Sequence, residues 1–234
     1  NALAVSICAN ANAYEQSFSG TAGTVGVVSG TPAAGATTVD IDDGGTPGDG
    51  GALFNVGDIV HFQEADGSQY EITGIAGDTL TIRQLDNANG GGLKSALTAA
   101  TTVRRRWKYY DQVDAAPGTS TWATGKNVTN DEMHVVVYDR NGDITGYDGD
   151  LAGSRTSAVI ERFAFVSQAE DAKTAQGGTN FYVNVINTAS EYVRWADHDA
   201  SLTDAGETAA EAIAGSSSTF ASGTGKAGIV NSVL

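Results

Sequence analysis

The sequence predicts an α+β protein rich in β-structure, in which a mixed sheet-and-helix body domain carries an inserted small antiparallel β-barrel-like domain. Two observations predict this class. Thirty glycines against only three prolines, together with repeated turn dipeptides, indicate many short connections between strands. The composition also shifts between residues 30 and 103, within a chain of 234 residues that is long enough for one large or two small domains.

We expect four parts in chain order. They are the first strand of the body domain, the inserted and protruding β-rich domain, the rest of the body domain, and a helix with a flexible connection to further sequence: 1–29, 30–103, 104–199 and 200–234. The run Asn1–Ile7 is an apolar strand candidate, and any buried strand would show the same pattern. The chain starts at Asn1 and its single methionine is Met133, so we expect it to be a fragment or a processed piece.

Within the inserted part, three short strands joined by tight turns are expected to form a meander: Phe54–Phe62, Gln69–Ile75 and Thr79–Arg83. Thr37–Ile41 is expected as a half-exposed strand, and Thr101–Val103 as a further strand that pairs with the meander. Closure into a barrel would hide the edges that a flat meander leaves open. This pattern predicts a shape and no chemistry.

The run Arg104–Tyr110 (RRRWKYY) combines cations with aromatic rings, which is the composition of a single-stranded nucleic-acid platform. The formal net charge of the whole chain is −15, however, and phosphates are repelled by a surface of their own sign. We therefore expect the arginines to pair with acidic groups, within the protein or on another subunit, where they would form an assembly contact. The same charge argues against nucleic acid and anionic membranes as partners.

The body domain is predicted to centre on a β-hairpin. Met133–Tyr138 is the first strand, Asp139–Asp143 supplies turn residues, and Ile144 restarts an extended segment. A second apolar segment, Ser157–Phe163, would pack against the first strand. Upstream, we expect a loop around Pro117 with Trp122 as its anchor.

Further along, Asn180–Asn187 fits a short helix or a covered strand, and we favour the helix. A strand is expected at Glu191–Trp195 and a helix at Thr203–Ala214, followed by a flexible connection over residues 215–228. One or two helical turns are possible at 94–99 and 167–179.

Candidate chemical sites are weak. Five oxygen-bearing residues between Asp139 and Asp150 suggest a calcium loop, namely Asp139, Asn141, Asp143, Asp148 and Asp150. Counted from Asp139, glycine falls at the fourth position and not at the sixth as in an EF-hand, so a turn that needs Asp and Gly for backbone reasons is the better interpretation. The acidic stretch at 40–49 is interpreted in the same way.

His61, His134 and His198 lie far apart in the chain without a partner at metal-ligand spacing. We interpret His134, inside an apolar strand, as a core residue with its hydrogen bonds satisfied. Cys8 is the single cysteine, so no intrachain disulfide is expected, and no stretch approaches eighteen apolar residues. The motifs of serine hydrolases, P-loops and dinucleotide sites are absent. The sequence predicts no catalytic, cofactor-binding or metal residues, and hence no enzyme.

Residues 107–198 carry a resemblance that these physical arguments do not supply. WKYYDQVDAAPGTSTWATGKNVTNDEMHVVVYDRNGDITG, followed by AVIERFAFVSQAEDAKTAQGGTNFYVNVINTASEYVRWADH, resembles the middle of the tail sheath proteins of contractile-tailed (myovirus-type) bacteriophages. The matching pieces are the PGTS loop, the NDE strand with its I-T-G turn, the DAK segment, and N-F-Y through E-Y-V-R-W, in that order. The opening LAVSIC is similar to the first body strand of that family.

The resemblance implies a structural subunit that assembles helically around a tail tube and contracts to drive the tube through the host envelope during genome ejection. Its partners would be further copies of itself, the tail tube protein, and the baseplate and tail terminator proteins. Its location would be the virion, after assembly in the host cytoplasm. The terminal arms of that family are not recognisable here. The alternative is an acidic, β-rich surface or carbohydrate-binding module stabilised by calcium.

Overall fold

The computed structural model describes residues 2–64, 67–85, 91–127, 129–151, 153 and 155–195. The chain divides into two compact units, which we describe separately. Among the described residues, unit 1 contains 2–14 and 109–195, and unit 2 contains those of Glu15–Lys108. Strands dominate both units and the helices are short, which confirms the α+β, β-rich class. The predicted insertion at 30–103 falls inside unit 2.

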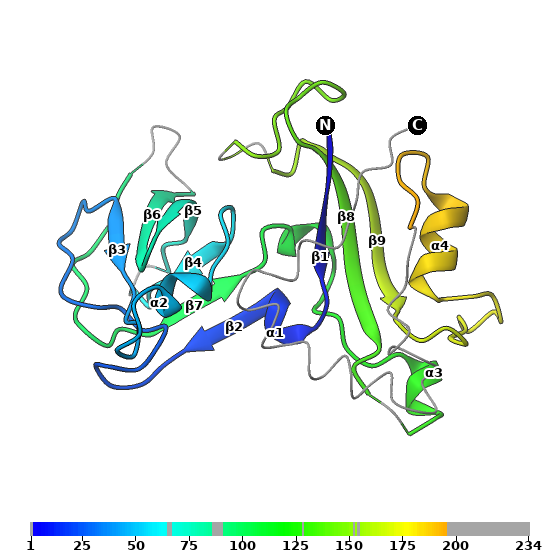
Figure 1. Cartoon of the computed structure of the whole chain (residues 1–234), viewed down its shortest axis with the longest axis horizontal. Coiled ribbons are helices and arrows are strands. Elements are labelled where there is room, and N and C mark those ends of the chain that lie inside the picture. The colour runs from blue at the N-terminus through cyan, green and yellow to red at the C-terminus, as the bar shows by residue number, and fades with distance from the viewer. Residues whose placement is uncertain are drawn as a thin grey trace. The chain divides into compact units, whose positions relative to one another are not determined.

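Unit 1 is built on a three-stranded antiparallel sheet in the order β1-β8-β9 (Figure 1). The strands are β1 (Leu3–Cys8), β8 (Glu132–Asp139) and β9 (Val159–Ser167). β8 is the central strand, and its run of three valines is buried or nearly so. The β-branched side chains of Val135 to Val137 suit a strand covered on both faces. Three predictions are confirmed: the first strand, the strand from Met133, and the packing of the second apolar segment against it.

Helix α4 (Tyr182–Ala189) lies beside β9 (Figure 1) and confirms the helix favoured from the sequence. Its apolar side packs with the sheet in a core that contains Met133, Val135, Val166, Phe181, Tyr182 and Ile186. The other helices among the described residues of unit 1 are single turns: α1 (Ala11–Tyr14), the 3₁₀ turn η1 (Tyr110–Gln112) and α3 (Thr121–Thr124). Trp122 in α3 packs on Ala169 and Ala172, as expected of a loop anchor.

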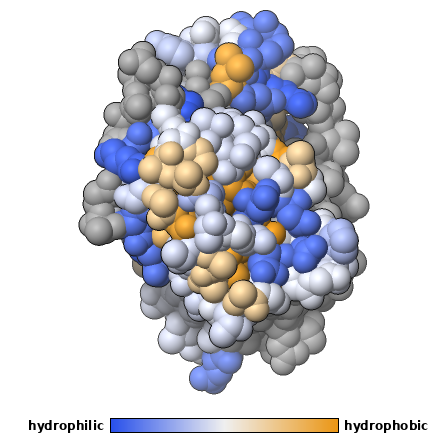
Figure 2. All heavy atoms as spheres, turned by 90° about the vertical axis from the view of Figure 1, so that its left-hand side faces the viewer, coloured by the Kyte–Doolittle hydropathy of each residue, from blue (hydrophilic) through white to orange (hydrophobic). Residues whose placement is uncertain are grey.

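Unit 2 contains a six-stranded antiparallel sheet in the order β2-β7-β4-β5-β6-β3, with one short helix, α2 (Asp49–Ala52). The strands are β2 (Glu15–Phe18), β3 (Thr38–Asp40), β4 (Ile59–His61), β5 (Tyr70–Ala76), β6 (Thr79–Gln84) and β7 (Val103–Arg106). The predicted three-stranded meander is confirmed as β4-β5-β6, although β4 is shorter than expected. The strand predicted at Thr101–Val103 is β7, which pairs with β4 and extends through the arginine run. On the face seen in Figure 2, hydrophobic side chains are interspersed with hydrophilic ones.

The edge strands of this sheet are β2 and β3, and no closed barrel is detected among the described strands. The segment around Val28 makes backbone hydrogen bonds to two different parts of unit 2. The Val28 N–H donates to Thr101 O at 3.0 Å, and the Ser29 N–H donates to Asp40 O at 2.8 Å. Val28 also forms an isolated antiparallel bridge with Ile41.

Two sequence predictions for unit 1 are wrong. Ile144 does not restart a strand, because its N–H donates to the Asp139 carboxylate at 2.8 Å and the chain turns back on itself. β8 pairs instead with β9, across a loop that spans residues 140–158. Residues 191–195 are not a strand, because Asn187 ties Trp195 back to the end of α4.

The possible helical turns at 94–99 and 167–179 do not form a helix in the described structure. The predicted helix at Thr203–Ala214 and the flexible connection after it lie outside the described residues. No helix among those described is long and apolar enough to cross a membrane.

Candidate functional site

The arginine run occupies β7, where side chains alternate between the two faces of the sheet. Arg104 and Arg106 therefore share one face, and their side chains are 42% and 26% exposed. Arg105 points to the opposite face, is buried, and donates from Nη1 to Leu53 O at 2.9 Å. A run of three identical residues thus supplies two accessible cations and one buried one.

Glu15 on the neighbouring strand β2 binds both accessible arginines. Arg106 Nε lies 2.6 Å from Glu15 Oε2, and Arg104 donates to Oε1 of the same carboxylate. Burial acts to raise the pKa of Glu15, but the two guanidinium groups outweigh it and hold that pKa below the ordinary value. The acidic neighbour predicted for the arginines is therefore found within the protein for this pair.

The antiparallel register extends this pairing across the sheet. One row runs Glu15, Arg106, Ile59, Glu71 and Arg83 on adjacent strands. Arg83 Nη2 lies 2.6 Å from the buried Glu71 Oε2. Opposite charges that face each other across strands stabilise a sheet. The row counts two acids against two arginines, and Arg104 adds one further cation to the same face.

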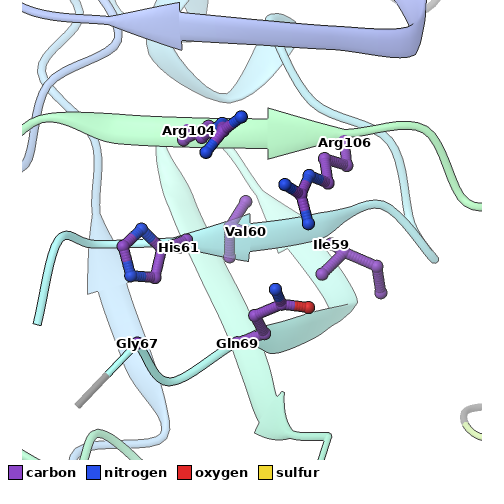
Figure 3. A pocket seen from close by; sticks show the side chains of 7 residues that line it. All are labelled: Ile59, Val60, His61, Gly67, Gln69, Arg104 and Arg106. Atoms are coloured by element: carbon purple, nitrogen blue, oxygen red, sulfur yellow. The ribbon is translucent and has the colours of Figure 1, made fainter. Parts of the chain in front are cut away.

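A hollow of about 230 Å³ opens on this face, lined by Ile59, Val60, His61, Gly67, Gln69, Arg104 and Arg106 (Figure 3). Its side chains include the donor groups of Arg104, Arg106 and the Gln69 amide nitrogen, which suit an anionic or carbonyl group. Small-molecule sites usually measure about 300–1,000 Å³, so this hollow is sized for one side chain and not for a larger ligand. We call it the arginine pocket.

The structure places two of the three histidines, and neither belongs to a metal site within the residues it describes. His61 lines the arginine pocket, and its Nδ1 accepts a hydrogen bond from the Gln63 N–H at 3.3 Å. His134 is fully buried, which confirms it as a core residue, and His198 lies outside the described residues. Within the described part of the chain, no group of three or more His, Cys, Asp or Glu residues is placed to hold a metal ion.

Asp139 shows why the aspartate loop has its composition. Its buried carboxylate accepts hydrogen bonds from the N–H groups of Gly142, Ile144 and Thr145 and from the Thr145 hydroxyl. Desolvation would raise the pKa of Asp139, but these donors lower it below the ordinary aspartate value. Gly142 has φ 84°, which glycine adopts without strain.

A second buried carboxylate joins three loops of unit 1. Asp131 is fully buried and accepts from Ser120 N and Ser120 Oγ, both at 2.8 Å, and from Ser167 Oγ at 2.7 Å. Ser120 Oγ in turn accepts from the Ala123 N–H and so caps α3. Asp131 gives no local signal in the sequence, because its partners lie 11 and 36 residues away.

No protein-family model matches the chain, and no curated protein matches it.

Proposed function

We propose that this protein is a structural subunit of a contractile phage tail sheath, which assembles helically around the tail tube and drives it through the host envelope on contraction. On this proposal its partners are further copies of itself, the tail tube protein, and the baseplate and terminator proteins. Work would come from the free-energy difference between two packings of one polymer.

The observation that carries the proposal is that the separate pieces of the sheath resemblance meet in space. Ser120 of the PGTS loop, Asp131 of the NDE strand and Ser167 at the end of β9 share one buried hydrogen-bond cluster. These pieces therefore belong to one ordered body within unit 1. Their roles here are capping and cross-linking of loops, which is what a subunit that acts by its contacts requires.

The later pieces of the resemblance converge in the same way. Tyr182 of the N-F-Y piece packs edge-on against Trp195 of E-Y-V-R-W, with ring centroids 4.5 Å apart. The Asn180 N–H donates to Ala172 O of the DAK segment at 2.9 Å. These contacts support the proposal that the resembling pieces maintain the fold of unit 1.

For unit 2 we propose a barrel-like arrangement that protrudes from the assembled subunit. The segment around Val28 supports it, because its backbone bonds reach Thr101 beside β7 and Asp40 at the end of β3. That segment could therefore fill the gap between the two sides of the open sheet, as closure of a small β-unit would require.

Electron microscopy of the purified protein tests the sheath proposal. Tubes or contracted rings with a helical repeat are expected at high protein concentration. Monodisperse monomers under all conditions would contradict the proposal.

The alternative, an acidic surface or carbohydrate-binding module stabilised by calcium, predicts a rise in melting temperature with added calcium, because a ligand that binds only the native state stabilises it. The sheath proposal predicts no calcium-dependent shift. A thermal melt with and without millimolar calcium, with magnesium as the control, separates the two.

A further inference from the structure

The loop from Asp143 to Leu151 in unit 1 exposes three large apolar side chains within a few residues. Ile144 is 44% exposed, Tyr147 54% and Leu151 60%. Scattered single apolar residues on a surface are ordinary, but three on one short loop mark a candidate contact surface. Tyrosine in particular is enriched in protein interfaces.

This loop is held in one conformation before any partner binds. The Asp139 carboxylate accepts from the Ile144 and Thr145 N–H groups at 2.8 and 2.7 Å, and Gly146 N donates to Gly142 O at 3.1 Å. At the base of the loop, Arg140 Nε lies 2.8 Å from Asp150 Oδ2. Preorganisation reduces the conformational entropy lost on binding, so the exposed side chains form a ready-made contact.

The loop also offers a negative charge. Asp143 is exposed, and its carboxylate has no hydrogen-bond or ion-pair partner among the described residues. The adjoining Asp150 is engaged by Arg140. The loop therefore carries an exposed carboxylate directly before Ile144 in the chain and four residues before Tyr147. A complementary surface would combine a cation with an apolar floor.

The arginine pocket on unit 2 has those properties. Arg104 is its most exposed cation, and Ile59 and Val60 contribute apolar lining. Its volume of about 230 Å³ suits one inserted side chain. In a chain with 28 acidic and 13 basic residues, a pocket lined, among the described residues, by two arginines and by no acidic residue is a distinctive place for an acidic loop to bind.

We propose that the loop Asp143–Leu151 of one copy of the chain docks into the arginine pocket of a second copy, with Asp143 beside Arg104 and Tyr147 or Ile144 inserted over Ile59. The proposal rests on the sheath function, of which it names one subunit contact. The two faces of this contact differ, so each copy keeps one free loop and one free pocket. Such a heterologous contact continues into an open chain of subunits unless a rotation closes it into a ring.

Sedimentation velocity over a concentration series tests the proposal with two variants, one altered in the loop and the other in the pocket. Ile144→Ser/Tyr147→Ser removes the apolar part of the loop but keeps the backbone N–H of residue 144 that Asp139 binds. Arg104→Ala removes the exposed cation of the pocket and leaves Arg106 paired with Glu15. Tyr192→Ser, at a tyrosine 39% exposed elsewhere in unit 1, is the matched control. Circular dichroism confirms that each variant retains the wild-type fold.

We expect the wild type and the control to self-associate, and each of the two variants to need at least a tenfold higher concentration for the same association. An equimolar mixture of the two variants should form a heterodimer and nothing larger, because it contains one intact loop and one intact pocket per pair. A monomeric wild type, unaltered association of the variants, an equal loss in the control, or a mixture without heterodimer would each overturn the proposal.

The same samples viewed by electron microscopy separate this proposal from the sheath function. Tubes from the wild type and from both variants would refute the docking contact and leave the sheath proposal standing. Head-to-tail oligomers that depend on the loop and the pocket but never form tubes would support the contact and contradict the sheath proposal.

Discussion

At the scale of single residues, the fold of unit 1 depends on buried polar groups that receive donors from distant parts of the chain. Asp131 and Asp139 are both fully buried, and both bind main-chain N–H groups. A carboxylate so placed orders a loop that has little apolar surface of its own. Replacing such a carboxylate lowers the free energy of unfolding strongly, because several buried donors lose their acceptor at once.

Substitution Asp131→Ala is predicted to destabilise the protein by about 3 kcal/mol, because Ser120 N, Ser120 Oγ and Ser167 Oγ all lose their acceptor. Urea denaturation at neutral pH measures the change. The control is Asp143→Ala at an exposed carboxylate, for which a change within about 0.5 kcal/mol is expected. Equal effects of the two substitutions would show that Asp131 does not join the loops.

His134 is predicted to make stability depend on pH. Its Nδ1 accepts from the Phe165 N–H at 3.0 Å and its Nε2 faces Ala115 O at 2.9 Å, so the folded site accommodates the neutral ring with its proton on Nε2. Burial lowers the pKa of His134 in the folded state. The unfolded chain therefore takes up the proton first, below its pKa of about 6.5, and stability falls as the pH falls.

Protonation of His134 alone should lower the free energy of unfolding by at most about 1.4 kcal/mol per pH unit below pH 6.5, until the folded-state pKa is reached. Urea denaturation at pH 7.5, 6.5 and 5.5 measures it. His134→Gln should remove this slope, whereas His61→Gln, in the arginine pocket, should keep it. A wild-type slope retained in His134→Gln would assign the pH dependence to other groups.

At the scale of elements, the strands that depend on local pattern could be predicted from the sequence. β5 and β6 follow the expected bounds closely because apolar β-branched residues and tight turns determine both. The failures are of another kind. Ile144 and the segment 191–195 have strand-like composition, but the Asp139 and Asn187 side chains capture their backbone groups. Side-chain capture of the backbone competes with strand pairing and leaves no periodic signal.

For the candidate site, the arginines could be predicted from the sequence, but the residues that surround them could not. The arginine run is visible as composition, and an acidic partner was expected for it. Glu15 itself could not be chosen, because it lies 89 and 91 residues from Arg104 and Arg106 and is brought there by the β2-β7 register. His61 and Gln69 join the pocket through β4 and β5 only once that register exists.

Asn187→Ala is predicted to release the segment after α4. The Asn187 amide accepts from the Trp195 N–H at 2.6 Å and donates to Trp195 O at 3.0 Å, so both backbone groups lose their partner. Hydrogen exchange at the Trp195 amide should accelerate about tenfold, which corresponds to about 1.4 kcal/mol, the upper range for one hydrogen bond. Asn184→Ala, at an exposed asparagine of the same helix, is the control and should leave the exchange rate unchanged. Unchanged exchange in Asn187→Ala would show that packing of Trp195 on Tyr182 holds the segment alone.

At the scale of the whole molecule, the chain leaves unit 1 after Tyr14 and returns to it at Tyr109. Within unit 1 the two points are close, since the Tyr14 hydroxyl donates to Tyr110 O at 2.9 Å. Within unit 2 the first and last strands pair, with Glu15 opposite Arg106. Ends that lie together are the condition under which one domain can be inserted in another at little cost.

Deletion of residues 15–108, with a short Gly-Ser linker from Tyr14 to Tyr109, is therefore predicted to leave unit 1 folded. The apolar cluster that includes Val5 in β1, Met133 in β8 and Ile186 in α4 is drawn from residues of unit 1, so the deletion leaves this cluster complete. Dispersed amide signals in an NMR spectrum, with cross-strand contacts between β1 and β8, would verify the fold. The isolated segment 15–108 is the companion variant, because its sheet and its core also lie within its own bounds. Collapse of the deletion variant beside a folded 15–108 segment would mean that unit 1 depends on unit 2 for its stability, and the insertion would then have to be regarded as part of the body.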